Sequence, residues 1–419
     1  MISRLARGFQ TRCLLWGGLV CLVLPSGNAV HGQVGLPPFS NFETARERLI
    51  QDVLIPGGVN DTRVIDAIRA TPRQEFIPFS LRADAYADSA LPIGASQTIS
   101  SPYIVSIMTQ ELDVQADHKV LEIGTGSGFQ AAVLSPLVKE VYSIEIVPEL
   151  GKQAKKVLDA LGYRNVFTKI GDGFLGWEEH APFDRIIVTC SPEDVPQPLV
   201  DQLIEGGLIV VPVGERYQQT LYLMRKVDGK LEREALRPTL FVPMTGTAEE
   251  NRQVHVDPAR PALLNGDFEQ PPADNGYVPG WYYQRGLKWS SSEESPNGGH
   301  YVEFTNETAG RPAHLLQGIA LDGRVVKRVR LSGSVKVDGV KVGLDRNELP
   351  VIGIRFFNDQ RGLLGTHWIG PFRGTRDWKE ESRVFRVPAA AREAIVSIGL
   401  LGGVGKVAFD GIQLEAVEP

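Results

Sequence analysis

Short apolar runs rich in β-branched residues alternate with segments of helical periodicity between residues 119 and 213. Runs that are apolar on both faces and alternate with helices are typical of a parallel sheet that helices cover on both sides. We therefore predict an α/β fold built on a doubly wound, mostly parallel sheet. The expected strands are residues 120–123, 141–145, 166–170, 185–189 and 208–213, and the expected helices are residues 129–138, 148–161 and 196–205.

Two segments precede this sheet. Residues 41–80 repeat apolar side chains at spacings of three and four, which predicts helices separated by the break at residues 56–58. Residues 91–102 contain so many turn-forming residues that we expect a long irregular loop there. Because long loops inside compact domains are usually functional, we expect this loop to belong to a site.

The chain changes character after Pro243. Residues 256–261, which include Pro258 and Pro261, indicate a linker. Beyond them glycine-rich turns separate short alternating runs, a pattern typical of an all-β sandwich. We therefore place the α/β domain at residues 33–255 and the β-sandwich at residues 262–419. The clearest runs are residues 329–337, 351–357 and 394–400.

The first 32 residues have the pattern of a secretory signal peptide. Arg4, Arg7 and Arg12 precede an apolar run at residues 13–24, and small residues follow. The run is too short to span a bilayer, which needs about 20 residues, so a permanent anchor is the weaker alternative. We expect an exported protein, periplasmic or secreted, without a stable membrane span.

Charge and cysteine content exclude several classes of function. Removal of residues 1–32 would leave 41 basic and 50 acidic residues, a formal charge of −9, so nucleic acid is not an expected partner. That chain would keep Cys190 alone, which we expect to be a buried, inert thiol. The seven His are scattered without ligand spacing, so we expect no metal in the α/β domain.

Residues 120–128 run from a strand into a glycine-rich turn. Gly124, Gly126 and Gly128 allow the backbone to approach a ligand closely, and the expected helix after them supplies unpaired N–H groups. The third glycine comes one position too early for the dinucleotide fingerprint. Glu122, inside the strand, would repel a pyrophosphate but could face a cationic ligand. We therefore predict S-adenosyl-L-methionine as the cofactor.

Two more acids follow expected strands. Glu145 closes the second strand, where a carboxylate can accept both ribose hydroxyls, and Asp172 with Gly173 follows the third, where they could contact adenine. Each acid taken alone is better explained as an ordinary surface carboxylate. The carboxyl ends of parallel strands meet at one edge of a sheet, so we predict that Glu122, Glu145 and Asp172 form one pocket.

At this point the sequence resembles protein-L-isoaspartate O-methyltransferases across residues 42–246. A Thr-Ile-Ser loop joined to this glycine turn is specific, whereas the glycine turn alone is not. The segments that carry the resemblance are residues 91–94 (LPIG), 97–103 (QTISSPY), 120–130 (VLEIGTGSGFQ), 171–173 (GDG), 181–189 (APFDRIIVT), 205–207 (EGG), 211–214 (VPVG) and 241–243 (FVP).

The resemblance implies a Rossmann-like methyltransferase domain with Ser100 as its active-site serine. The alternative for Ser100 is a capping role after Thr98. The implied reaction moves a methyl group from S-adenosyl-L-methionine to the free carboxylate of L-isoaspartyl residues in damaged proteins or peptides, and the ester then cyclises to a succinimide. The expected cofactor contacts are Gln97, Thr98, Ile99, Glu122, Gly124, Gly126, Gly128, Glu145, Asp172, Gly173 and Thr245.

The chemistry suits these residue types. The acceptor carboxylate is already an anion, so an in-line displacement at the methyl group needs no strong general base. Positioning must then supply most of the rate. The hydroxyl of Ser100 could orient the acceptor by a hydrogen bond.

Residues 262–417 resemble galactose-binding-like jelly rolls through residues 264–269, 280–281 and 407–415. The resemblance implies a structural calcium near Glu269 and Asp410. A glycan or another cell-envelope ligand is one interpretation, and a module that merely stabilises the enzyme or docks it to envelope proteins is an equally supported one. Core packing is the alternative for the aromatic residues that could form a sugar-stacking face, namely Trp281, Tyr282, Tyr283, Trp289, Trp368 and Trp378.

Two other functions stay open. One is an exported methyltransferase for a different carboxylate acceptor, with the same donor pocket and another substrate loop. The other is a glycan-binding or adhesion protein whose methyltransferase fold has lost activity, against which the intact Ser100, Glu122, Glu145 and Asp172 argue.

Overall fold

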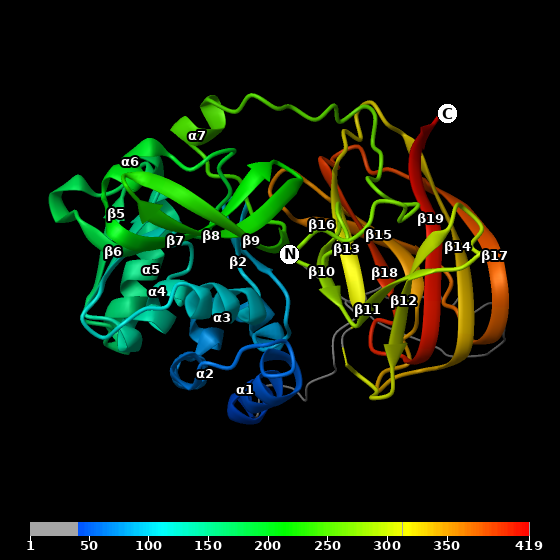
Figure 1. Cartoon of the computed structure of the whole chain (residues 1–419), viewed down its shortest axis with the longest axis horizontal. Helices are drawn as coiled ribbons and strands as arrows, with labels where there is room; N and C mark the ends of the chain where they lie inside the picture. The colour runs from blue at the N-terminus through cyan, green and yellow to red at the C-terminus, as the bar shows by residue number, and fades with distance from the viewer. Residues whose placement is uncertain (1–40, 312, 419) are drawn as a thin grey trace, which may run out of the picture.

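The computed structural model describes residues 41–311 and 313–418, so the expected signal peptide lies outside the described residues. Figure 1 shows an α/β part on the left and a β-sandwich on the right. Each part has its own buried apolar core, as expected for a two-domain chain. The predicted domain limits, residues 255 and 262, lie between α7 (Thr247–Glu250) and β10 (Tyr282–Arg285). The exact boundary residues stay a prediction.

Helices form the N-terminal part, as the periodicity predicts. α1 (Phe42–Leu49) begins after Asn41, whose side chain accepts a hydrogen bond from the backbone of Thr44 at 3.0 Å. A π-helical turn (Ile50–Leu54) continues it, and α2 (Thr62–Ala70) follows the glycine break. Two 3₁₀ turns (Arg73–Phe76 and Phe79–Asp84) then lead towards α3 (Pro102–Glu111).

Residues 91–102 differ from the prediction. They form an antiparallel hairpin of β1 (Leu91–Gly94) and β2 (Gln97–Ile99) instead of an irregular loop. Ala95 and Ser96 both have positive φ, 49° and 61°, which is the backbone geometry of a two-residue hairpin turn. The prediction was wrong because Ala-Ser is not a composition that signals such a turn.

The central sheet has the strand order β5-β4-β3-β6-β7-β8-β9. The first five strands in this order pair in parallel, and β8 and β9 add an antiparallel edge. The strand order reverses at β3, so a crevice opens beside its carboxyl end. The strands are β3 (Lys119–Ile123), β4 (Glu140–Glu145), β5 (Val166–Ile170), β6 (Phe183–Val188), β7 (Leu203–Glu215), β8 (Gln218–Val227) and β9 (Lys230–Thr239).

Helices cover both faces of this sheet. Val120 packs with α1 to α4 in one core, whereas its neighbours Leu121 and Ile123 pack with α6 and α7 in another. The helix expected at residues 196–205 is shorter than predicted, because its chain becomes extended again at Leu203 to join the sheet. The remaining helices are α4 (Phe129–Leu134), a 3₁₀ turn (Ser135–Leu137), α5 (Pro148–Leu161), 3₁₀ turns (Gly173–Leu175 and Glu178–His180) and α6 (Gln197–Asp201).

The C-terminal part is the predicted β-sandwich. Two five-stranded antiparallel sheets, β10-β13-β18-β15-β16 and β11-β12-β19-β14-β17, enclose one apolar core. No helix occurs in it within the described residues. Its strands after β10 are β11 (Leu287–Ser291), β12 (His300–Asn306), β13 (His314–Ala320), β14 (Arg328–Lys341), β15 (Val351–Phe357), β16 (Leu363–Ile369), β17 (Gly374–Arg386), β18 (Glu393–Gly399) and β19 (Val404–Val417).

The two domains touch directly. The sheet that begins with β10 faces the α/β domain, and Figure 1 shows β10 beside β9. A Cβ placed on Gly318 of β13 would lie 2.9 Å from Leu240 and 3.4 Å from Tyr217, so the domains pack without a gap there. Within residues 41–311 and 313–418, no helix is both long and apolar enough to cross a membrane.

Candidate active site

A pocket opens where β3, β4 and β6 end, as the reversal of strand order predicts. Its volume is about 810 Å³ when the open solvent at its mouth is included. Of the residues predicted to bind cofactor or substrate, it brings together Gln97, Thr98, Ile99, Ser100, Gly124, Gly126, Glu145, Gly173 and Thr245. Glu122, Gly128 and Asp172 do not line it.

The glycine turn forms the floor of the pocket. Gly124 has φ 96°, and a Cβ there would come within 2.6 Å of the Thr189 hydroxyl oxygen. That hydroxyl lies 2.7 Å from the carbonyl oxygen of Gly124 and 3.0 Å from that of Ile123, so it ties the end of β6 to the turn. Gly128 lies behind the floor, where a Cβ would be 3.2 Å from Leu158 of α5. Its role is therefore close packing of the turn against a helix.

Glu145 holds the turn from the end of β4. Its Oε2 accepts a hydrogen bond from the backbone of Gly126 at 2.7 Å, and its Oε1 accepts one from Val147 at 2.9 Å. Burial raises the pKa of Glu145, and these backbone hydrogen bonds partly offset that rise. A carboxylate at the lip of the turn is placed to accept hydroxyl donors from a ligand, as predicted for ribose.

Asp172 lies beside the pocket and not in its lining. Its carboxylate accepts hydrogen bonds from the Thr247 backbone (2.9 Å), the Thr247 hydroxyl (2.7 Å) and the Phe174 backbone (2.9 Å). Burial raises the pKa of Asp172, but these hydrogen bonds outweigh burial and hold it below its usual value. In this structure Asp172 fixes the segment that presents Gly173 to the pocket.

Glu122 is placed differently from what its position in the motif suggested. Its side chain is fully buried beneath the pocket, where Oε2 accepts a hydrogen bond from the Ser143 hydroxyl. That hydroxyl lies 2.6 Å from the hydroxyl of Thr125 in the glycine turn. Burial raises the pKa of Glu122 to about 8, further raised by the charge of Glu145. Glu122 therefore supports the turn from behind, and its direct contact with the cofactor stays a prediction.

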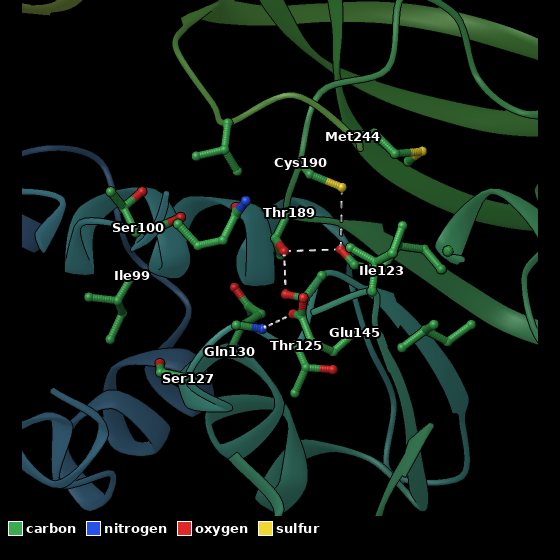
Figure 2. A pocket seen from close by; sticks show the side chains of 18 of the residues that line it. Ile99, Ser100, Ile123, Thr125, Ser127, Gln130, Glu145, Thr189, Cys190 and Met244 are labelled. Atoms are coloured by element: carbon green, nitrogen blue, oxygen red, sulfur yellow. Dashed lines mark hydrogen bonds between the residues drawn. The ribbon is translucent and has the colours of Figure 1, made fainter. Parts of the chain in front are cut away.

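The hairpin strand β2 brings the other wall of the pocket. Figure 2 shows Ile99 and Ser100 on one side and Glu145, Thr189 and Cys190 across from them. Among the residues that the structure describes, the Ser100 hydroxyl has no hydrogen-bond partner, so it is free to bind a substrate. The neighbouring Ser101 is fully buried and caps α3, accepting a hydrogen bond from Ile104. The capping role thus belongs to Ser101 and not to Ser100.

Thr245 lies at the pocket because the segment that follows β9 is hydrogen-bonded to the segment that follows β6. The Ser191 backbone donates to Val242 at 2.8 Å, and the Met244 backbone donates to Ser191 at 2.9 Å. These bonds fasten the segment after β9 to the end of β6. Thr245 and Met244 consequently line the same pocket.

Cys190 is a lining residue that the sequence did not point to. It was expected to be a buried thiol without a role, yet it faces the pocket from the end of β6 (Figure 2). Burial raises the pKa of the Cys190 thiol, and the charges of Glu145 and Asp172 raise it further. A raised pKa keeps the thiol protonated, which agrees with the inert thiol expected for Cys190. Its position in the lining could not be read from an apolar run.

Comparison with known proteins places this geometry in a family. The family model for protein-L-isoaspartate(D-aspartate) O-methyltransferase matches residues 44–249. A protein-L-isoaspartate O-methyltransferase from Dictyoglomus turgidum is 50% identical over 205 residues, which cover 49% of this chain and 93% of that protein. The chain belongs to the protein-L-isoaspartate O-methyltransferase family.

Two further members agree in extent. Protein-L-isoaspartate O-methyltransferase 1 from Syntrophobacter fumaroxidans is 47% identical over 206 residues, covering 49% of this chain and 96% of its own. A solved protein-L-isoaspartate O-methyltransferase aligns with 30% identity and a TM-score of 0.44, covering 48% of this chain and 67% of its own. The family model and the two relatives from Dictyoglomus turgidum and Syntrophobacter fumaroxidans place the family match in the α/β half of the chain.

The acids predicted to share calcium in the β-sandwich do not form a complete site. Asp410 is buried, and its Oδ2 accepts hydrogen bonds from the Ser295 hydroxyl (2.7 Å) and the Asn297 backbone (2.8 Å). Glu269 is engaged by His300 instead, with 2.9 Å between Oε2 and Nδ1. The described residues contain no cluster of three metal-binding side chains. The two carboxylates lie near enough to influence each other, and Oδ1 of Asp410 is buried without a partner, but no third metal-binding side chain from the described part of the chain joins them. Calcium binding stays a prediction.

The predicted sugar-stacking face is wrong for two of its six aromatic residues. Trp281 and Tyr282 are 0% and 1% exposed, because one packs in the sandwich core and the other at the domain contact. Trp289 is stacked on His300 and partly buried, whereas Trp368 is 40% exposed. The aromatic side chains therefore do not form a single surface.

Proposed function

We propose that this chain is an exported protein-L-isoaspartate O-methyltransferase that methylates the free carboxylate of L-isoaspartyl residues in damaged proteins or peptides. The observation that carries the proposal is the unpartnered Ser100 hydroxyl facing the glycine turn and Glu145 across one pocket. Family membership of the α/β half supports the same reaction.

The lining suits S-adenosyl-L-methionine, which when bound supplies a methyl group activated by a sulfonium. Gly124 and Gly126 leave backbone open to the ligand, and Glu145 offers a carboxylate to its hydroxyl groups. Gly173 and Thr245 bound the pocket on the remaining sides. Within the part of the chain that the structure describes, the lining has one carboxylate, Glu145, and no Lys or Arg, which is compatible with a cationic donor and unfavourable to a pyrophosphate.

The residues of the chain contribute by positioning. The isoaspartyl carboxylate is an anion at neutral pH, so no residue needs to remove a proton from it. The Ser100 hydroxyl can donate a hydrogen bond to one carboxylate oxygen and point the other at the methyl group. Residues 97–100, from β2 onward, and the segment around Thr245 border the pocket.

The test is incubation of the full chain with labelled donor and either an isoaspartyl peptide or its aspartyl twin. We expect methyl label in the isoaspartyl peptide and background label in the twin. Equal label in both would favour another carboxylate acceptor. Absence of label in both, with the donor bound, would favour a protein that has lost activity.

Export is the second part of the proposal. It rests on the basic and apolar pattern of residues 1–32. Cell fractionation after expression of the full chain should recover shortened protein and activity outside the cytoplasm. Activity confined to the cytoplasm with an uncut N-terminus would contradict it.

A ligand for the β-sandwich is a weaker proposal, since Trp281 and Tyr282 are buried. Trp368 on β16 is exposed and therefore accessible to a glycan or cell-envelope ligand. Binding of the full chain to a glycan array, lost in Trp368→Ala, would support this role. Absence of binding to all glycans would favour a domain that stabilises the enzyme.

A further inference from the structure

The strand β10 of the β-sandwich is distorted where it meets the α/β domain. Its pairing with β13 shifts register between Tyr282 and Arg285, and Tyr283 has φ 52°. A positive φ is unfavourable for a residue with a Cβ, and such bulges turn a side chain out of the regular alternation. Tyr283 accordingly packs against the core of the α/β domain.

Tyr283 reaches the residue next to Ser100. Its phenol lies near the Ser101 hydroxyl. Burial raises the pKa of Tyr283 to about 12, so the phenol keeps its proton at neutral pH. Ser101 also caps α3, so this contact bears on the junction between β2 and α3.

Arg285 holds the same junction from a second point. It forms an ion pair with Asp88, and the two side chains are only 15% and 4% exposed. Asp88 in turn accepts a hydrogen bond from the backbone of Tyr103 at 3.0 Å. The guanidinium of Arg285 also lies 4.5 Å from the centre of the Tyr103 ring. Tyr103 is the second residue of α3, three positions after Ser100.

Both contacts fall on one short stretch of chain. The active-site loop, residues 97–101, enters the pocket with β2 and leaves it at the start of α3. Its hairpin belongs to a sheet of two strands, so no larger sheet fixes it. The first residues of α3 have partners in their own domain, Gly57, Asp88 and Arg237. Tyr283 and Arg285 of the other domain add contacts to the same residues.

We propose that Tyr283 and Arg285 are positioning residues for methyl transfer, which hold the active-site loop so that Ser100 faces the donor. The inference rests on the proposed function and assigns the β-sandwich a part in it. The catalytic half of the chain then depends on the other half for its turnover, although it contains every residue of the pocket. Loss of either contact allows Ser100 to move, and small displacements of a positioning group lower the rate strongly.

The experiment compares three variants and one control variant of the full chain at saturating donor and isoaspartyl peptide. Arg285→Met should lower kcat at least tenfold, and Arg285→Lys should recover part of that loss because it keeps the charge opposite Asp88. Tyr283→Phe should lower kcat severalfold with little change in melting temperature. Hydrogen–deuterium exchange at residues 97–104 should become faster in Arg285→Met.

The matched control is Arg361→Met. Arg361 pairs with Glu393 at 3.5 Å in the same β-sandwich, near Tyr217 of the other domain, with side chains 20% and 10% exposed. Its loss should lower the melting temperature comparably but leave kcat within twofold of the wild type and exchange at residues 97–104 unchanged.

Two results would overturn the inference. One is a kcat within twofold of the wild type in both Arg285→Met and Tyr283→Phe. The other is an equal loss of kcat in Arg361→Met, which would reflect general domain packing. A wild-type chain that fails to label the isoaspartyl peptide would refute the proposed function instead, and the exchange comparison would still decide whether β10 holds the loop.

Discussion

The two walls of the pocket are held by different means. The wall of strand ends is built inside a seven-stranded sheet, where Glu145 and Thr189 bind the backbone of the glycine turn directly. The active-site loop lies on a two-stranded hairpin, and its junction with α3 is buttressed by β10 of the β-sandwich. This difference indicates that donor binding depends on local structure, whereas acceptor positioning depends on contacts between distant parts of the chain.

The largest effect is expected from Gly124→Ala, which breaks the strand-end wall. The added Cβ would meet the Thr189 hydroxyl at a backbone φ of 96°. Strain and the displaced hydroxyl together should raise the Kd of S-adenosyl-L-homocysteine roughly 100-fold, about 3 kcal/mol. Calorimetric titration measures it.

Gly162→Ala is the control for backbone strain alone. Gly162 has φ 83° at the end of α5, with open space where its Cβ would point. It should lose some stability but bind the ligand as the wild type does. An equal loss of binding in both variants would mean that strain, and not the pocket, is responsible.

Ser100→Ala tests the opposite wall. Removal of one hydrogen bond to an anionic acceptor should lower kcat about 10- to 100-fold, from roughly 1.5–3 kcal/mol. The Kd for the donor should stay nearly unchanged, because the strand-end wall is intact. Loss of donor binding in this variant would reassign Ser100 to the donor side and remove the contrast between the walls.

Glu145→Gln should have a smaller effect on the donor side. The amide can still accept from the Gly126 backbone but has lost its charge, so the donor Kd should rise about tenfold. Glu140→Gln, at the other end of β4, is the matched control and should leave the Kd unchanged. A Kd unaffected by Glu145→Gln would exclude this carboxylate as a ligand for the donor.

The smallest effect on activity is expected from Glu122→Gln, and its signature is in pH dependence. The pKa of Glu122 is raised from 4.5 to about 8 by burial. Between these two pH values the native chain retains a proton that the unfolded chain releases, so this group makes stability fall as pH rises. The variant should lack that contribution, which is at most about 5 kcal/mol.

Urea unfolding at pH 5, 6.5 and 8 measures this contribution. The difference in the free energy of unfolding between variant and wild type should move in favour of the variant as pH rises from 5 to 8. A constant difference over this range would contradict the protonated state assigned to Glu122.

The parallel sheet was predictable because its strands are buried on both faces. Apolar runs such as residues 141–145 therefore stood out, and all of these residues are buried in β4. The glycine turn was equally visible, because its spacing and its place after a strand follow from backbone geometry alone. Local rules thus sufficed for the sheet and the glycine turn, but not for Glu122 and Asp172, which lie beneath and beside the pocket.

The other wall was not predictable in the same way. The turn at Ala95 and Ser96 adopts positive φ without the residues that usually signal it, so hairpin β1-β2 was missed. The burial of Glu122 depends on which face of β3 its side chain occupies, which the residue type does not decide. The pair Arg285 and Asp88 joins residues almost two hundred positions apart, and no pattern in a single sequence points to such a contact.

The most direct measurement is calorimetric titration of the full chain with S-adenosyl-L-methionine and with S-adenosyl-L-homocysteine. The account predicts one saturable site for each, lost in Gly124→Ala and retained in Ser100→Ala. Failure of the wild-type chain to bind either compound would contradict the assignment of the pocket. It would also contradict the assignment of donor binding to the strand-end wall and of acceptor positioning to the active-site loop.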